Sequence, residues 1–212
     1  MCLIISNIFS IIRIKNIIIA LVCIFITFLK LDESLFQFNS IITTCIIVLL
    51  MTSTNIINDI FDISTDKINR PNRLLIQKPV LVKMVAYLST GMILSAILLS
   101  FFLNINSILI VVASSPILIL YSIFFKKTPI MGNLLVSFFL ALVFIFVAVS
   151  CDISVFEILP EALIAFSISF IREILKDGED YIGDKKSSFN TTAVFFGIKQ
   201  TAYISCFLIL IF

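Results

Sequence analysis

The amino-acid sequence predicts an all-helical, polytopic membrane protein, because it is very apolar and its apolar residues are grouped in long runs. Of its 212 residues, 60% are hydrophobic and 13% are charged, with a mean hydropathy of +1.19. An ordinary soluble domain is about a quarter charged. Several runs reach the roughly 20 residues needed to cross the hydrocarbon layer. Each must satisfy its backbone hydrogen bonds internally, so we expect helices.

Seven apolar segments are expected to form these helices. Their Ile and Phe content would favour strands in water, but their length favours helices. Arg13 and Lys15 precede the first segment, which lacks an A-x-A-like cleavage site and is therefore interpreted as a retained span rather than a signal peptide. The segments are approximately 16–31, 39–60, 80–103, 105–125, 133–151, 157–175 and 192–212.

The charged residues outside these segments are distributed unevenly between the two sides of the membrane. By the positive-inside rule, the N-terminus and the loops after even-numbered spans are cytoplasmic, and we expect an integral protein of the plasma (inner) membrane. The predicted cytoplasmic side holds Arg13, Lys15, Lys67, Arg70, Arg73, Lys78, Lys83, Lys126, Lys127, Arg172, Lys176, Lys185 and Lys186, with Lys199 entering the last span. The opposite side holds Lys30, Asp32, Glu33, Asp152, Glu157 and Glu161.

Several classes of function are excluded by what the sequence lacks. It has no His, which removes imidazole metal sites, Ser-His-Asp triads and His general bases. It has no GxxxxGK[ST] or GxGxxG motif for a nucleotide, and a net charge of +2 is too small to suggest nucleic acid. No obligate protein partner is evident. The cysteines Cys2, Cys23, Cys45, Cys151 and Cys206 show no CxxC spacing and are interpreted as apolar filler.

The most informative pattern is a set of three aspartates spaced i, i+3 and i+7 that occurs twice. Residues at these offsets share one face of a helix, where carboxylates repel each other unless a cation joins them. Mg²⁺ takes oxygen ligands and typically uses one or two carboxylates together with substrate phosphates. Both copies close even-numbered spans, so they share the cytoplasmic face. The copies are Asn58-Asp59-x-x-Asp62-x-x-x-Asp66-Lys67 and Lys176-Asp177-x-x-Asp180-x-x-x-Asp184-Lys185.

Aspartates beside basic residues on one membrane face suit a diphosphate that is held through Mg²⁺, with Lys and Arg on its non-bridging oxygens. An enzyme that uses a diphosphate next to an apolar interior points to an isoprenyl diphosphate. The sequence therefore predicts an enzyme that uses an isoprenyl diphosphate.

Three stretches resemble motifs of the UbiA-type intramembrane prenyltransferases. The first motif extends from Asn58 to Arg73, and the second, Arg-Glu-x-x-Lys-Asp-x-x-Asp-x-x-Gly-Asp, extends from Arg172 to Asp184. The second motif most resembles the archaeal-type digeranylgeranylglyceryl phosphate synthases and their bacterial relatives. Two departures are that Leu74 replaces a usual Pro and that the chain has about seven spans where the family usually has nine. The middle cytoplasmic loop is matched by Tyr121-Ser122, Lys126-Lys127 and Pro129-x-x-Gly132-Asn133.

The resemblance implies a helical bundle around a central cavity with a cytoplasmic cap, and Mg²⁺-dependent transfer of a prenyl group, expected to be geranylgeranyl, to a hydroxyl of a glycerol phosphate lipid. Asn58 would complete a metal shell or orient the diphosphate, and Lys176 would be neutralised by Asp180, leaving Arg172 for the acceptor phosphate. The implied metal ligands, which are also the catalytic residues with Asn58, are Asp59, Asp62, Asp66, Asp177, Asp180 and Asp184. The implied substrate-binding residues are Lys67, Arg70, Arg73, Tyr121, Lys126, Lys127, Asn133, Arg172 and Lys176.

Three alternatives remain open from the sequence. Within the prenyltransferases, the acceptor could be an aromatic, quinone-type substrate. A secondary transporter would need ionisable groups or broken helices near mid-membrane, where this sequence is apolar. An inactive remnant is the third reading, because we expect residues 1–212 to be one UbiA-like domain shortened at its C-terminus.

Overall fold

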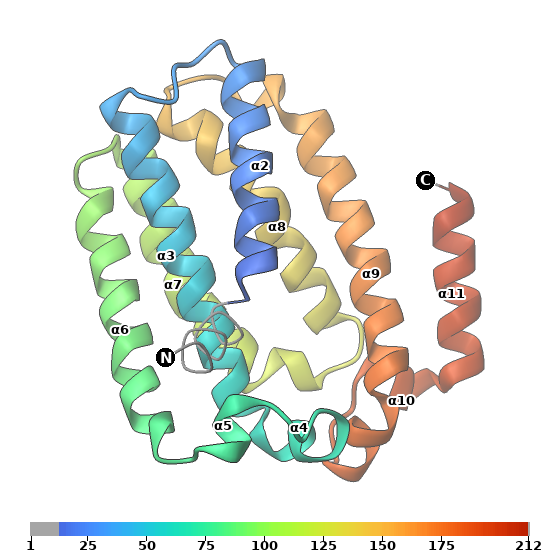
Figure 1. The fold of residues 1–212 in the computed structure, drawn as a ribbon. Coiled ribbons are helices and arrows are strands. Elements are labelled where there is room, and N and C mark those ends of the chain that lie inside the picture. The colour runs from blue at the N-terminus through green and yellow to red at the C-terminus, as the bar shows by residue number, and fades with distance from the viewer. Residues whose placement is uncertain (1–12, 212) are drawn as a thin grey trace.

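The computed structural model describes residues 13–211, and within this range every regular element is a helix (Figure 1). Cys2 and the last residue of the final predicted span lie outside the described residues. The other four cysteines are free thiols.

Because every regular element of residues 13–211 is a helix, the all-helical prediction is confirmed.

Seven long helices correspond to the seven predicted segments. Four of them, α3, α6, α7 with the turn that follows it, and α8, are long and apolar enough to cross a membrane. Of the others, α2 has 17 residues, α11 has 14, and α9 carries charges along its C-terminal part. The helices are α2 Ile14–Lys30, α3 Phe38–Phe61, α6 Leu81–Ser100, α7 Ile105–Ile123, α8 Met131–Ser150, α9 Leu159–Lys186 and α11 Ile198–Ile211.

The long helices pack as a bundle in which α3 lies along α6 and α8 lies along α9, while α2 lies beside α3 and in front of α8 (Figure 1). The main apolar core includes Phe28, Ile46 and Val147, none of which is measurably exposed to solvent. Hydroxyl groups within the bundle donate to carbonyl groups of the preceding turn, as Ser115 does to Val111. These local bonds satisfy polar groups that lipid cannot satisfy.

Four short helices cover one end of the bundle and are called the cap below. They are α4 Ile63–Asn69, α5 Leu74–Gln77, the 3₁₀ turn η1 Phe125–Lys127, and α10 Thr192–Phe196. A further 3₁₀ turn, η2 Val155–Glu157, lies between α8 and α9. The last predicted span is divided into α10 and α11 at Gly197, whose φ of 86° is strained for residues with a side chain.

The cap breaks the first aspartate pattern, contrary to the prediction of a single helix face. Helix α3 ends at Phe61 and α4 begins at Ile63, with Asp62 between them, so Asp59 and Asp66 lie on different helices. In the second pattern, Asp177, Asp180 and Asp184 all lie on α9, as predicted.

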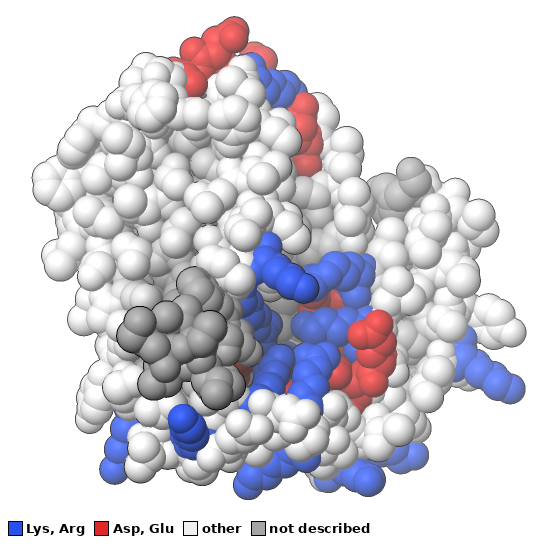
Figure 2. Space-filling model, viewed as in Figure 1, with Lys and Arg blue, Asp and Glu red and all other residues white. Residues whose placement is uncertain are grey.

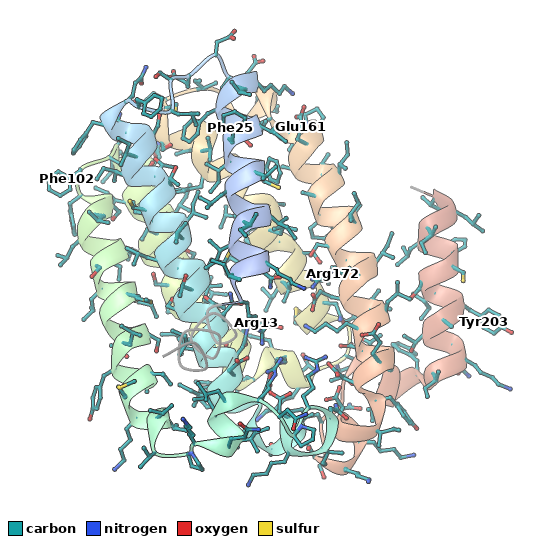
Figure 3. All side chains as sticks on the ribbon, in the orientation of Figure 1. Arg13, Phe25, Phe102, Glu161, Arg172 and Tyr203 are labelled. Atoms are coloured by element: carbon teal, nitrogen blue, oxygen red, sulfur yellow. The ribbon has the colours of Figure 1, made fainter. Side chains whose placement is uncertain are left out.

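On the face shown in Figure 2, most charged residues at one end are acidic, whereas Lys and Arg gather around a hollow near the cap that also contains acidic residues. Figure 3 shows Glu161 at the far end and Arg13 at the start of α2 on the cap side. This separation agrees with the charge distribution predicted from the sequence.

Candidate active site

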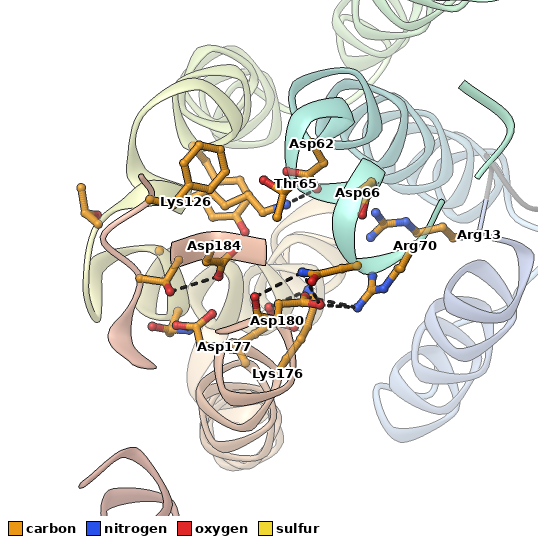
Figure 4. Close-up of a pocket in the computed structure, with 18 residues that line it drawn as sticks. Arg13, Asp62, Thr65, Asp66, Arg70, Lys126, Lys176, Asp177, Asp180 and Asp184 are labelled. Atoms are coloured by element: carbon orange, nitrogen blue, oxygen red, sulfur yellow. Dashed lines mark hydrogen bonds and ion pairs between the residues drawn. The ribbon is translucent and has the colours of Figure 1, made fainter. Parts of the chain in front are cut away.

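A cavity beneath the cap, called the polar cavity, is formed by the start of α2, α4, the end of α7, η1, the start of α8 and the end of α9 (Figure 4). Six carboxylates and four cationic side chains line it, so the lining carries two more negative than positive charges. The lining residues are Arg13, Asp62, Thr65, Asp66, Asn69, Arg70, Tyr121, Lys126, Thr128, Gly132, Asn133, Glu173, Lys176, Asp177, Asp180, Asp184, Phe189 and Thr191.

The aspartates of the first motif are each paired with a cation. Asp62 forms an ion pair with Lys126 of η1, and Asp66 forms one with Arg73. Asp59 lies outside the polar cavity, where it is held by Arg13 at 2.5 Å and by Arg73 at 2.9 Å. Burial raises the pKa of Asp66, Arg73 opposes this effect, and the neighbouring carboxylates of Asp62 and Asp59 add to it.

The two motifs meet at Asp180. Arg70 donates to both of its carboxylate oxygens, at 3.0 and 3.2 Å, and Asn69 donates to its backbone carbonyl at 3.2 Å. This contact requires α4 to approach α9 closely at Gly183, where an added Cβ would lie 2.3 Å from the Asn69 side chain. Gly183 is therefore a packing residue of α9, and an alanine in its place would force the Asn69 side chain to move.

Asp177 and Asp184 are held by neutral donors rather than by cations. Asp177 accepts from the Asn133 amide and from the Thr192 backbone N–H, both at 3.1 Å, and Asp184 accepts from the Thr191 hydroxyl at 3.0 Å. Burial raises the pKa of Asp177, against the effect of these hydrogen bonds. Burial, with smaller effects of the Asp180 and Asp177 carboxylates, raises the pKa of Asp184 to about 6.

Lys176 is paired with Glu173 at 3.2 Å rather than with Asp180, so the predicted neutralisation of Lys176 by Asp180 is wrong. Arg70 occupies Asp180 instead. Glu173 also accepts from Arg172 at 2.8 Å. The Arg172 side chain is 63% exposed and does not line the polar cavity, so in this arrangement it is not left free for an acceptor.

Other sequence-predicted site residues also lie away from the polar cavity. Asn58 accepts a hydrogen bond from the Ser122 hydroxyl at 2.8 Å, Lys67 is exposed on α4, and the Lys127 ammonium lies over the Phe189 ring. Arg73 reaches the first motif from outside the cavity. The predicted residues that do line it are Asp62, Asp66, Arg70, Tyr121, Lys126, Asn133, Lys176, Asp177, Asp180 and Asp184.

Several lining residues were not predicted as site residues. Asn69 and Glu173 lie inside the two motifs, and Arg13 was noted only as a topological charge, so the sequence offered a signal for these three. Thr65 also lies inside the first motif, whereas Thr128, Phe189 and Thr191 line the cavity and no sequence pattern marks them.

The donor set of the polar cavity fits Mg²⁺ by its chemistry. The carboxylates are hard oxygen ligands of the kind this ion prefers, and their excess over the cations leaves negative charge for a divalent ion to neutralise. Within residues 13–211, no three acidic or cysteine side chains already converge on one point that could hold a metal ion. Ion pairs and neutral hydrogen-bond donors hold the carboxylates in this arrangement.

A second cavity, called the apolar cavity, lies among α3, α7 and α8 and has a volume of about 150 Å³. Most of its lining residues are aliphatic or aromatic. Its polar lining residues are Thr54, Asn55 and Ser114, and Asn55 lies three residues before Asn58 on α3. A rise of about 1.5 Å per residue therefore separates these two positions by roughly 5 Å along the helix. The lining residues are Ile46, Ile47, Leu50, Met51, Thr54, Asn55, Ile110, Val111, Ser114, Leu118, Phe139, Leu142, Val143 and Phe146.

An all-helical apolar bundle with paired acidic motifs at one end defines an integral membrane protein with an oxygen-rich polar site. Residues 17–212 match the model of the UbiA prenyltransferase family, and the chain belongs to this family. It is 31% identical over 205 residues to digeranylgeranylglyceryl phosphate synthase of Saccharolobus solfataricus, covering 95% of this chain and 73% of that protein. It is 32% identical over 173 residues to the synthase of Methanococcoides burtonii, covering 81% of this chain and 62% of that protein.

Two solved structures are similar to this fold. One, reported for digeranylgeranylglyceryl phosphate synthase in membranes, has a TM-score of 0.72 and 28% sequence identity and covers 98% of this chain and 74% of that chain. The other, of a UbiA homolog from Archaeoglobus fulgidus bound to DMAPP and Mg²⁺, has a TM-score of 0.73. Its sequence identity is 16%, and it covers 97% of this chain and 74% of that chain.

Proposed function

We propose that this protein catalyses the Mg²⁺-dependent transfer of a prenyl group, geranylgeranyl in the first instance, from its diphosphate to a hydroxyl of a glycerol phosphate lipid. In this reaction the bond between the allylic carbon and the diphosphate oxygen breaks, a carbon–oxygen ether bond forms, and the hydroxyl proton is released. The observation that carries the proposal is the meeting of both acidic motifs with four cations in one cavity, next to an apolar cavity. The names of the relatives, digeranylgeranylglyceryl phosphate synthases, support the same reaction.

The ion pairs of the polar cavity suggest how its residues accept a diphosphate. Lys126 and Arg70 are held by Asp62 and Asp180, so both partners are in place before substrate binds. A diphosphate would take over the cations as charge-assisted hydrogen-bond donors, which frees the carboxylates to act as metal ligands. Bound Mg²⁺ would supply the neutralisation of the charge that develops on the departing diphosphate.

The metal ligands that we propose are the aspartates that line the polar cavity, Asp62, Asp66, Asp177, Asp180 and Asp184. We assign Asp59 a different role. Because Asp59 lies outside that cavity between Arg13 and Arg73, it holds two guanidinium groups beside the first motif. Tyr121 lines the polar cavity, and its aromatic ring would stabilise an allylic cation that forms there.

The apolar cavity is suited to the carbon chain next to the diphosphate. On α7, Leu118 of this cavity and Tyr121 of the polar cavity lie three residues apart, which is roughly 5 Å along the helix. An apolar cavity of about 150 Å³ is large enough to hold a group of the size of benzene. A chain lying there would leave its reactive carbon near Tyr121 and the polar cavity.

The membrane orientation is also a proposal. The Lys and Arg residues gather at the cap end, which supports a cytoplasmic position for the N-terminus and the polar cavity in the plasma membrane. We treat the whole chain as a single catalytic domain, with prenyl diphosphate, lipid acceptor and membrane lipid as its partners.

The reaction is tested by incubating membranes that contain the protein with labelled geranylgeranyl diphosphate and one acceptor at a time, and identifying the product by mass. We expect an ether product with geranylgeranylglyceryl phosphate. Prenylation of 4-hydroxybenzoate or a naphthoate instead would move the assignment to an aromatic acceptor. No prenylated product with any acceptor would favour an inactive remnant or a transporter.

The acceptor phosphate can be tested at Arg172. A guanidinium group binds a pair of phosphate oxygens better than an ammonium group does. In the structure this group is held by Glu173, at the edge of the polar cavity. If it engages the acceptor, Arg172→Lys raises the KM for the acceptor more than the KM for the prenyl diphosphate. Equal changes in both constants would assign Arg172 only to its ion pair with Glu173.

A further inference from the structure

A short strap between α9 and α10 reaches both ends of the second aspartate cluster. The Thr191 hydroxyl donates to Asp184 Oδ2 at 3.0 Å, and the Thr192 backbone N–H donates to Asp177 Oδ2 at 3.1 Å. Thr191 is 4% exposed and Thr192 is fully buried, so water does not substitute for these contacts. Two consecutive threonines therefore hold two aspartates that lie seven positions apart on α9.

The Thr192 hydroxyl extends this network to the start of α8. It accepts from the Ile130 backbone N–H at 2.9 Å and donates to Asn133 Oδ1 at 2.5 Å. Asn133 then has its amide nitrogen directed to Asp177 Oδ2, at 3.1 Å. Because the Asn133 oxygen is occupied by Thr192, its amide nitrogen is the group left to bind Asp177, and the amide orientation is fixed.

Asp177 and Asp184 differ in this respect from the other aspartates that line the polar cavity. Asp62, Asp66 and Asp180 are bound by cations, which neutralise them. The donors to Asp177 and Asp184 carry no charge and reach only Oδ2, so in the described part of the chain Oδ1 of each accepts no hydrogen bond. Each carboxylate is thus held in place by one oxygen and keeps both its charge and its second oxygen.

We propose that Thr191 and Thr192 are positioning residues that preorganise Asp184 and Asp177 for a divalent cation. This inference rests on the proposed function and extends it to residues outside both acidic motifs. A hydrogen bond to a ligating carboxylate fixes its rotamer, so less ordering is needed when the cation binds. Loss of such a second partner typically lowers metal affinity about 10–100-fold.

The test measures Mn²⁺ binding to the purified full-length protein by electron paramagnetic resonance, without substrate, for Thr191→Val, Thr191→Ser and Thr192→Val. The same proteins are assayed for prenyl transfer over a range of Mg²⁺ concentrations. Thr201→Val is the matched control, because Thr201 is equally buried and its hydroxyl donates only to Gly197 O, on α11 and away from both cavities. Circular dichroism checks that each variant is folded.

We expect Thr191→Val and Thr192→Val to bind Mn²⁺ about 10–100-fold more weakly and to need correspondingly more Mg²⁺, while Thr191→Ser and Thr201→Val stay close to the wild-type protein. If Thr191→Val does not fold, Thr191→Ala replaces it with the same expectation. Wild-type Mn²⁺ affinity in the folded valine or alanine variants would overturn this inference alone. Absence of Mn²⁺ binding by the wild-type protein even after geranylgeranyl diphosphate is added would overturn the proposed function itself.

Discussion

Asp184→Asn should make the metal-free protein more stable at neutral pH, although it removes a proposed metal ligand. The Asp184 side chain is buried, and its pKa is raised from the ordinary 3.8 to about 6, first by burial and then by Asp180 and Asp177. Between these two pH values the folded protein binds more protons than the unfolded chain, so the free energy of unfolding falls as pH rises. At 1.36 kcal/mol for each tenfold change in proton affinity, the loss is about 3 kcal/mol above pH 6.

The neutral amide that Asp184→Asn introduces removes this loss while still accepting a hydrogen bond from Thr191. Thermal unfolding in mild detergent with EDTA, followed by circular dichroism, should therefore show a midpoint at pH 7.5 that is higher by up to about 6–12 °C. The difference in midpoint between the variant and the wild-type protein should disappear near pH 4, because Asp184 is then protonated in the folded wild-type protein and is as uncharged as the amide that replaces it. Asp32→Asn, at an exposed position, is the control and should show neither effect. A variant that is less stable than the wild-type protein at pH 7.5, or a gain that does not change with pH, would refute the reasoning.

Two further predictions concern the apolar cavity and the topology. Val143→Phe narrows the apolar cavity and should lower kcat/KM for geranylgeranyl diphosphate at least about tenfold relative to that for dimethylallyl diphosphate. The control Leu94→Phe, on the exposed side of α6, should leave this ratio unchanged. An unchanged ratio in Val143→Phe would show that the prenyl chain does not bind in this cavity. In a background without native cysteines, Asn72→Cys and Lys186→Cys should react only with thiol reagents that reach the cytoplasm, and Ser34→Cys only with reagents added outside. Labelling of the first two variants from opposite sides would contradict a single site formed by both acidic motifs.

The positions of the long helices could be predicted well because apolar length and charge are local properties of the sequence. The segment predicted at 133–151 corresponds to α8 at Met131–Ser150, and the second motif lies on one helix, as its spacing indicated. The break of the first motif at Asp62 could not be predicted in this way. Its spacing remains helical on both sides of the break, and only the change in helix direction separates Asp59 from the polar cavity.

The partners of the charged residues depended on contacts that spacing does not contain. Lys176 has Glu173 three positions before it and Asp180 four positions after it, and both are compatible with a helical pair. Arg70, the residue that follows α4, forms the ion pair with Asp180, and Lys176 pairs with Glu173. The threonine strap is likewise held by contacts between separate elements, for which neither periodicity nor a motif gives a signal.

The central claim is that the two acidic motifs form a single Mg²⁺-dependent diphosphate site, and diphosphate release measures it most directly. Asp62→Asn and Asp180→Asn each remove one carboxylate, one from the first motif and one from the second. In the wild-type protein these carboxylates pair with Lys126 and Arg70. When residues act as one unit, losing any one of them removes most of the activity. Each single variant should therefore release diphosphate at least about 100-fold more slowly than the wild-type protein, and the double variant should be no slower than either single variant. Excess EDTA should abolish release by the wild-type protein. Multiplied losses in the double variant, or turnover that persists in EDTA, would contradict the account.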